Sequence, residues 1–416
     1  MHIITSLEDP ALAKFIAHPD KDIELFAGPG GFSEGRTLAG APHRTALGIE
    51  YDQAACETAT AAGHPRLLWD IAKLDPLRFG AVRGIHSSPP CPGFSAAGKG
   101  LGRRDLDMLA EAAESMANYP EPWYIEEVMA WVRTNQADPR SALSLEPLRW
   151  ILLLQPEWWS LEQVKEVLPL WEIYAKTLGA HGYSVWSGKV SSEQYGVPQT
   201  RVRAIAYGSR VRKVGPMVPT HSKFYPRDKA RRDPGVLDFV TMREAMGWAA
   251  DTRVVSNYGT GGDPAARGER TADEPAATVT SKAGRNRVVH GARVLNSGPK
   301  PTASMDNGNF RWVPEAANEG TIEADMEWAG ERPSPMIVSS FAADVVAAPG
   351  WRKPGDGPRQ KAKGSIRVTV QEAGILQSFP PDYPWKGTKT KQHEQVGNAV
   401  PPLLGKAMYE TVNGLR

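Results

Sequence analysis

The sequence predicts a doubly wound α/β fold with a second, loop-rich domain. Short apolar runs alternate with helical patterns along the first half of the chain, and a glycine-rich turn follows the first run. From about residue 209 the helical pattern fades, and Gly, Pro, Arg and Asp dominate. Strands alternating with helices at this spacing are typical of a parallel sheet covered by helices. A chain of 416 residues is long enough for such a sheet and one further domain.

The expected elements follow in order. Residues 1–20 are interpreted as a short helical leader outside the main fold, with a helix at 11–17. The strands are expected at 22–26, 45–49, 66–69, 82–86, 158–161, 184–190 and 202–207. The helices between them are expected at 33–38, 53–62, 144–154 and 166–178. Two more helices, at 105–118 and 123–134, interrupt the alternation, so residues 98–137 are interpreted as an insertion.

Residues 209–363 are expected to form the separate, loop-rich domain. One short apolar helix is predicted there, near 242–248. Order returns at residue 367, and the chain ends with a helix at about 403–412. The main domain would therefore combine residues 21–208 with residues 364–416.

Composition limits the partners and the compartment. The formal net charge is only +2, so any basic surface for a nucleic acid must be local. Two cysteines and no evident signal peptide indicate a reducing cytoplasm. No apolar run is long enough to span a membrane, and the nine histidines show no metal-ligand spacing.

Cys91 stands in the Pro/Gly-rich turn S-S-P-P-C-P-G-F-S, directly after an expected strand. A thiolate held rigidly in a partly open site suits nucleophilic catalysis. The alternative is a buried, apolar cysteine. The other cysteine, Cys56, falls on an expected helix and is assigned to the core.

The glycine-rich turn 26–31 and two acids form a second candidate site. Glycines after a strand let a ligand approach the backbone, and the next helix adds a positive dipole. Glu50 and Asp70 follow the next two strands, where they could accept hydrogen bonds from ribose hydroxyls and an adenine amino group. Phe26 could pack against the adenine ring. This pattern favours a nucleoside cofactor, although either acid alone could be a solvated carboxylate.

Seven short motifs occur in a fixed order along the chain. They are residues 26–31, Pro90-Cys91, 138–143, 161–164, 195–203, 367–372 and 395–402. Together they resemble the motifs of the DNA (cytosine-5) methyltransferases, over nearly all of the chain outside 98–137 and 209–363. Three positions depart from the usual pattern: Glu24 replaces aspartate, Pro92 replaces glutamine and Gln163 replaces asparagine.

The resemblance implies a Rossmann-like, S-adenosylmethionine-dependent methyltransferase core, with residues 209–363 as its target-recognition domain. Cys91 would add to a cytosine flipped out of duplex DNA, and Glu162 would hold or protonate ring nitrogen 3. Arg201 and Arg203 would bind the cytosine carbonyl, activate the thiol or bind a phosphate. Both can point into one pocket, because residues i and i+2 of a strand share a face. A similar motif at 126–128 lies in an expected helix, so Glu162 is favoured.

The resemblance also implies the remaining contacts and partners. The expected cofactor contacts are Phe26, Gly28, Gly30, Gly31, Glu50, Asp70, Pro90, Asn398 and Val400. The expected DNA contacts are Ser95, Lys99, Arg103, Arg104, Gln199, Arg227 and Arg231. The product would be S-adenosylhomocysteine, and no metal is expected. The chain would act as a monomer on double-stranded DNA in a bacterial or phage-infected cell. A cognate restriction endonuclease is a possible partner enzyme.

Two alternative functions stay open. The first is a tRNA cytosine-5 methyltransferase of the same fold, whose relatives carry a Cys-Phe-Thr segment that this sequence lacks. The second is a catalytically inactive DNA-binding homologue. Inactivity would predict damage to Cys91, Glu162 or the arginine pair, and all of these are present.

Overall fold

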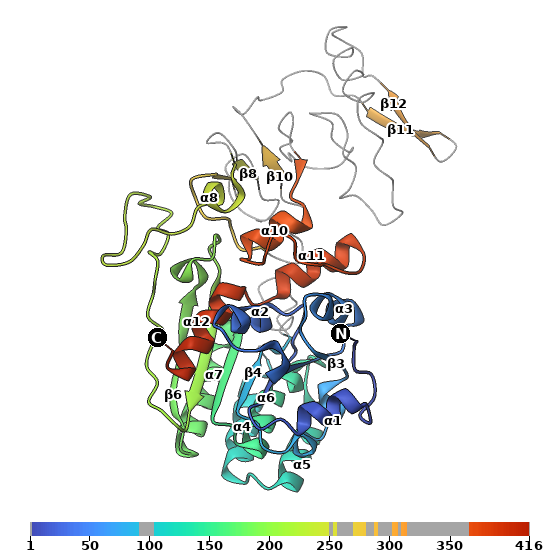
Figure 1. Cartoon of the computed structure of the whole chain (residues 1–416), viewed down its shortest axis with the longest axis vertical. Helices are drawn as coiled ribbons and strands as arrows, with labels where there is room; N and C mark the ends of the chain where they lie inside the picture. The colour runs from blue at the N-terminus through green and yellow to red at the C-terminus, as the bar shows by residue number, and fades with distance from the viewer. Residues whose placement is uncertain are drawn as a thin grey trace.

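A seven-stranded mixed sheet, flanked by helices, forms the lower part of the protein as drawn in Figure 1. The computed structural model describes residues 2–90, 104–248, 253–255, 269–279, 287–289, 302–306, 309–313 and 366–415. The strand order is β3-β2-β1-β4-β5-β7-β6. The bounds are β1 (Asp22–Leu25), β2 (Ala46–Glu50), β3 (Arg66–Leu68), β4 (Gly84–Ser87), β5 (Trp158–Val164), β6 (Ser184–Ser191) and β7 (Val202–Ser209).

The predicted α/β fold is confirmed, with one reversed strand. The first five strands in this order, from β3 across to β5, are parallel to one another. Strand β7 runs antiparallel to both of its neighbours, β5 and β6. A parallel neighbour would need a crossover of a dozen or more residues. The chain instead passes from β6 to β7 through the short 3-10 turn at Ser192–Tyr195, so β7 turns back beside β6.

Helices cover both faces of this sheet. Their bounds are α1 (Pro10–Ile16), α2 (Gly31–Leu38), α3 (Gln53–Ala61), α4 (Leu106–Asn118), α5 (Pro122–Asn135), α6 (Glu146–Leu154), α7 (Leu168–Ala180) and α12 (Pro402–Asn413). Two further helices, α10 (Val370–Leu376) and α11 (Lys389–Asn398), pack against each other and lie above the sheet in Figure 1. Side chains of one strand alternate between the faces. Trp159 joins the core cluster beneath α4, α6 and α7, and Trp158 joins a second cluster with Leu404 and Met408 of α12.

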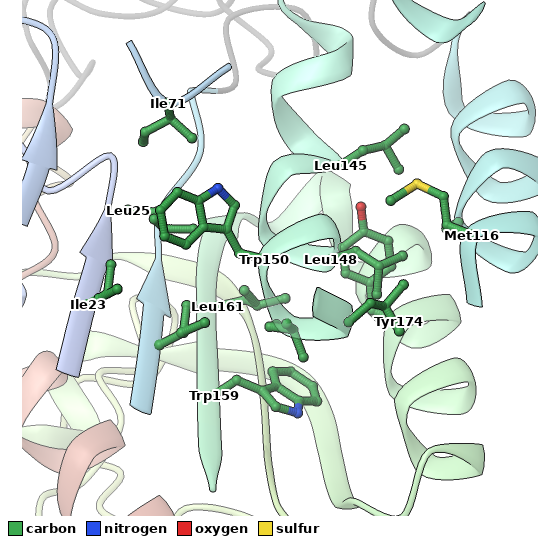
Figure 2. Close-up of a cluster of buried hydrophobic side chains, with 14 of the residues drawn as sticks. Ile23, Leu25, Ile71, Met116, Leu145, Leu148, Trp150, Trp159, Leu161 and Tyr174 are labelled. Carbon is green, nitrogen blue, oxygen red and sulfur yellow. The ribbon is translucent and has the colours of Figure 1, made fainter. Parts of the chain in front are cut away.

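The first of these core clusters is the larger. Figure 2 shows Ile23, Leu25 and Leu161 of the sheet beside Leu148 and Trp150 of α6. All five side chains are fully buried. No helix within the described residues is long and apolar enough to cross a membrane.

The interpretation of residues 1–20 as a leader outside the main fold is wrong. Ile4 forms a parallel bridge with Leu67 of the edge strand β3. Leu12 and Phe15 of α1 are buried in the first core cluster. A short helix gains most of its stability from such tertiary contacts, which the local sequence pattern does not display.

Helices α4 and α5 belong to the same core. Leu109 and Met116 of α4, and Ile125 and Met129 of α5, are fully buried in the first core cluster. The described part of 98–137 therefore completes the helical layer over the sheet. The break in strand–helix alternation marks two added helices that are integral to the packing.

The second domain is described in part. It contains α8 (Met242–Met246) and a four-stranded sheet in the order β13-β10-β8-β9, with β11 paired to β12 apart from it. These strands are β8 (Arg253–Val255), β9 (Glu269–Thr271), β10 (Arg287–Val289), β11 (Thr302–Asp306), β12 (Asn309–Val313) and β13 (Ile366–Arg367). Because β13 pairs with β10, residues 366–367 belong to this sheet and not to the main domain.

Candidate active site

The glycine-rich turn lies directly after β1, at the carboxyl end of the parallel strands. Phe26, Gly28 and Gly30 have positive φ angles of 55°, 52° and 101°. A bulky residue rarely adopts this conformation, and such strained residues cluster at ligand sites. Tyr383 Oη donates a hydrogen bond of 2.6 Å to the Pro29 carbonyl. The C-terminal segment therefore holds the turn in place.

The glycines of this turn have different reasons to be glycine. A Cβ on Gly28 would meet no heavy atom of the described residues within 4 Å, so its backbone borders open space. A Cβ on Gly31 would lie 2.0 Å from the Val400 carbonyl oxygen. Gly31 is thus needed for α2 to pack on the C-terminal segment. The Val400 side chain is itself buried in the second core cluster, together with Leu404 and Met408 of α12.

Glu50 closes one side of the turn. Its Oε2 accepts a hydrogen bond of 2.8 Å from the Gly28 amide, and its Oε1 accepts from the amides of Tyr51 and Asp52 at 2.8 and 2.9 Å. Burial raises the pKa of Glu50, and these backbone donors act in the opposite direction. A carboxylate has about four acceptor positions, so Glu50 can still accept a hydrogen bond from a ligand hydroxyl.

The remaining expected cofactor residues lie at strand or helix ends. Asp70 follows β3, has a side chain 47% exposed, and accepts a hydrogen bond of 3.1 Å from the Ala72 amide. Asn398 is exposed at the end of α11, and Pro90 is partly buried after β4. These features fit a nucleoside cofactor: the backbone is open at Gly28, Glu50 is a buried acceptor, and Asp70 is a more exposed acid at the next strand end.

The segment leading to Cys91 is anchored between β1 and β5. The Ser88 amide donates to the Leu25 carbonyl at 3.3 Å. The Gln163 side-chain amide donates a short hydrogen bond to the Pro89 carbonyl. Cys91 itself lies outside the described residues. The pairing of β4 with β5 nevertheless brings the start of its motif beside the glutamate motif.

Glu162 and Arg203 form a buried ion pair. Arg203 Nε lies 2.9 Å from Glu162 Oε1, and the two side chains are 13% and 5% exposed. The antiparallel register causes this meeting, because Arg203 pairs with Val164, two residues beyond Glu162 on β5. Glu162 lies within β5, which continues past the predicted end at residue 161. The competing glutamate, Glu126, lies on α5 as expected.

Arg201 does not join this pair in the expected way. Its guanidinium Nη1 donates to the carbonyls of Val279 and Gly397 at 3.0 Å, and Nη2 donates to the Ala399 carbonyl at 3.2 Å. Burial lowers the pKa of Arg201 below its ordinary value. Arg201 therefore ties the second domain and the C-terminal segment to the sheet. The i, i+2 rule identifies the shared face but not the partners.

The expectation that Gln199 contacts DNA is wrong. Gln199 is fully buried. Its side-chain amide donates to the Leu376 carbonyl at 3.0 Å and to the Gln377 side chain, and its Oε1 accepts from the Val279 amide at 2.7 Å. Because these contacts occupy both of its donors, Gln199 belongs to the same junction as Arg201.

The other expected DNA contacts divide into two groups. Ser95, Lys99 and Arg103 lie outside the described residues. Arg104, Arg227 and Arg231 are exposed. The Arg231 guanidinium lies over the Tyr225 ring, 3.9 Å from its centroid, in a cation–π contact.

Sequence reasoning missed several groups around this site. Tyr383 was assigned no contact with the glycine turn, and Gln163 was assigned none with the turn that contains Cys91. His86 was predicted only as the last residue of a strand, with no role in the site. The position of Gln163 in the glutamate motif was the only available signal. The contacts of Tyr383 and His86 depend on segments far apart in the chain, so no local pattern could indicate them.

Comparison with known proteins agrees with this geometry. A family model described as C-5 cytosine-specific DNA methylase matches residues 21–123 and 130–413. The chain is 25% identical to type II methyltransferase M1.HphI of Haemophilus parahaemolyticus, over 94% of this chain and 86% of that protein. It is 24% identical to type II methyltransferase M.DdeI of Desulfomicrobium norvegicum, over 94% and 88% respectively.

The solved structures support the fold. The S. pombe Dnmt2 methyltransferase is similar with a TM-score of 0.50 and 15% identity, over 95% of this chain and 98% of that one. The family match covers far more than half of the sequence and includes most of residues 98–137. The chain therefore belongs to the C-5 cytosine-specific DNA methylase family.

Proposed function

We propose that this protein uses S-adenosylmethionine to methylate carbon 5 of a flipped-out cytosine in a short duplex DNA sequence, through a covalent bond to Cys91. The observation that carries this proposal is the arrangement of β4 and β5. The strand that leads to Cys91 lies beside β5, whose Glu162 pairs with Arg203 of β7, and the glycine turn follows β1 on the other side of β4. The bacterial relatives are named as type II methyltransferases, which favours a restriction-modification role.

Carbon 5 of cytosine is too weak a nucleophile to take a methyl group unaided. The enzyme must therefore activate the ring with a nucleophile of its own. The Cys91 thiolate would add to carbon 6, forming a carbon–sulfur bond and making the ring enamine-like. Bound S-adenosylmethionine supplies an electrophilic methyl group for carbon 5. Loss of the carbon 5 proton to a base would then break the bond to Cys91 and restore the aromatic ring.

Glu162 and Arg203 would act on the cytosine ring together. Glu162 would hold or protonate ring nitrogen 3, which would relieve negative charge during addition. Arg203 would orient this carboxylate and donate to the cytosine carbonyl, because a guanidinium offers several donors in a rigid fork. We assign this role to Arg203 alone, since Arg201 binds three backbone carbonyls.

The residues around the glycine turn would hold the cofactor. Gly28 would allow close approach to the backbone, Glu50 would accept from the ribose hydroxyls, and Asp70 would accept from the adenine amino group. Asn398 is retained near the methionine end on resemblance alone. Val400 and Gly31 are better explained by their contact with each other.

DNA binding would require the cytosine to leave its base stack, at a cost of a few kcal/mol. The exposed Arg104, Arg227 and Arg231 are proposed to bind phosphates, together with Ser95, Lys99 and Arg103. We propose a monomer that acts on cytoplasmic DNA in a bacterial or phage-infected cell. The cognate endonuclease is an inference from the names of the relatives.

Sequencing that detects 5-methylcytosine in DNA from expressing cells tests the proposal directly. The intact protein is expected to leave 5-methylcytosine in one short sequence context, and Cys91→Ser to leave none. The variant should still bind S-adenosylhomocysteine, since Cys91 is not assigned to the cofactor. Cys56→Ser is the matched control and should keep its methylation, because Cys56 lies buried in α3. Methylation of tRNA instead of DNA would favour the alternative substrate.

A further inference from the structure

His86 is a buried polar side chain whose neighbours belong to all three parts of the site. It lies in β4 and is 1% exposed. Its Nδ1 is 2.8 Å from Ser160 Oγ, and its Nε2 is 3.0 Å from Ser88 Oγ. The ring stacks on Phe32, with a centroid distance of 3.5 Å and an interplanar angle of 4°.

Each neighbour lies a few residues from a group assigned to the reaction. Ser160 is two residues before Glu162 on β5. Ser88 is three residues before Cys91. Phe32 directly follows Gly31 at the start of α2. One imidazole ring therefore contacts the strand of Glu162, the segment that leads to Cys91 and the helix that begins at the glycine turn.

The protonation state of His86 makes these contacts directional. Burial lowers its pKa to about 3, so the ring is neutral at physiological pH. A neutral imidazole has one donor nitrogen and one acceptor nitrogen. One serine hydroxyl must therefore accept from the ring while the other donates to it. A phenylalanine at this position could keep the stacking on Phe32, but it could not orient either hydroxyl.

We propose that His86 is a positioning residue that fixes the segment leading into Cys91 relative to the strand of Glu162. This inference rests on the proposed function. In the proposed reaction His86 touches none of the reacting atoms. It would act through Ser88 and Ser160, and the stack on Phe32 would keep its ring plane aligned with the glycine turn. Misplacement of a nucleophile by about 1 Å can cost on the order of 100-fold in rate.

The test measures formation of the covalent protein–DNA complex separately from binding. A duplex carrying 5-fluorocytosine at the methylated site, incubated with S-adenosylmethionine, should trap the adduct, because after methyl transfer carbon 5 carries fluorine in place of the proton that a base would remove. The variants are His86→Phe, which keeps the stacked ring, His86→Asn, which keeps one amide, and the single changes Ser88→Ala and Ser160→Ala. Ser209→Ala is the matched control, since Ser209 is another buried serine of this sheet, and its Oγ donates to the Glu157 carbonyl and accepts from the Val211 amide, away from the groups assigned to the reaction.

We expect His86→Phe to slow adduct formation roughly 10- to 100-fold. Binding of S-adenosylhomocysteine and of unmodified duplex should change less than about threefold. Ser88→Ala and Ser160→Ala should each slow the adduct by about 10-fold, and His86→Asn should recover part of the loss. The serine variants keep the test valid if His86→Phe fails to fold.

Two results would overturn this inference. The first is adduct formation in the His86 and serine variants at the rate of Ser209→Ala. The second is a loss of adduct rate matched by equal losses in cofactor affinity, DNA affinity and unfolding free energy, which would indicate a structural role only. Failure of the unaltered protein to form any adduct would refute the proposed function instead.

Discussion

At the scale of single residues, two arginines of one motif have separate tasks. Arg203 pairs with Glu162, whereas Arg201 binds carbonyls of three residues in two other segments. We expect Arg203→Lys to lower kcat roughly 100-fold, because lysine cannot reproduce the guanidinium fork. Its unfolding free energy should change less than that of an Arg201 variant, because lysine keeps a positive charge beside Glu162.

Arg201→Met should show the opposite pattern. Loss of its donors leaves buried carbonyls unpaired, which costs about 1–3 kcal/mol for each group affected. Denaturant unfolding and steady-state kinetics on both variants separate the two roles. A fully stable Arg201→Met protein with a large loss of kcat would restore the catalytic assignment of Arg201.

A second residue-scale prediction concerns acid stability. The pKa of His86 is lowered to about 3, whereas an exposed histidine in the unfolded chain titrates at about 6.5. Between these values the unfolded chain binds a proton that the folded chain does not. The stability that His86 contributes is therefore complete above about pH 6.5 and falls as the pH drops towards 3.

At pH 5 this loss is on the order of 2 kcal/mol. Denaturant unfolding of the unaltered protein and of His86→Phe, at pH 7.5 and pH 5, measures it as a difference. The unaltered protein should lose about 2 kcal/mol more than the variant between the two conditions. Equal losses of unfolding free energy in the two proteins would show that His86 does not cause the loss of stability between pH 7.5 and pH 5.

At the scale of elements, the glycine turn offers a controlled comparison. Gly28 and Gly40 both have positive φ, of 52° and 86°, and a Cβ on either would meet no described heavy atom within 4 Å. Alanine at each position should cost about 1–2 kcal/mol in backbone strain. Only Gly28→Ala should also weaken S-adenosylhomocysteine binding, measured by calorimetry. Equal affinity in the two variants would argue against a cofactor site at Gly28.

The elements also show why sequence patterns predict some structure and miss the rest. The strands with continuous apolar residues were predicted within a few residues, because a buried parallel strand leaves a clear local pattern. Helix α11 was missed, since its ten residues K-T-K-Q-H-E-Q-V-G-N are mostly polar and show no apolar stripe. The direction of β7 was missed because alternation of side chains is the same in either direction.

At the scale of the whole molecule, the two domains share a buried junction. Met242 and Val279 of the second domain pack with Leu376, Phe379 and other apolar residues of the C-terminal segment. Gln199 and Arg201 hold this junction to the sheet through hydrogen bonds. The change in composition near residue 209 predicted a second domain. The junction could not be predicted, because the order of the motifs along the chain does not show which of their side chains are buried and which face solvent.

The charge distribution leads to a final prediction about the whole molecule. The net charge is only +2, yet residues 210–232 contain eight basic side chains and one acid. Arg227 and Arg231 in this segment are exposed. If they bind phosphates, each releases about one counterion, and DNA affinity depends on salt accordingly.

Arg227→Ala and Arg231→Ala should each reduce the slope of log Kd against log salt concentration by about 1, with similar loss on all DNA sequences. Lys176→Ala is the control of equal charge, because Lys176 is 79% exposed on α7, where it pairs with Glu114. This variant should leave the slope unchanged. A slope that shifts equally in all three variants would mean that only the total charge of the protein matters, and that the 210–232 segment does not bind DNA.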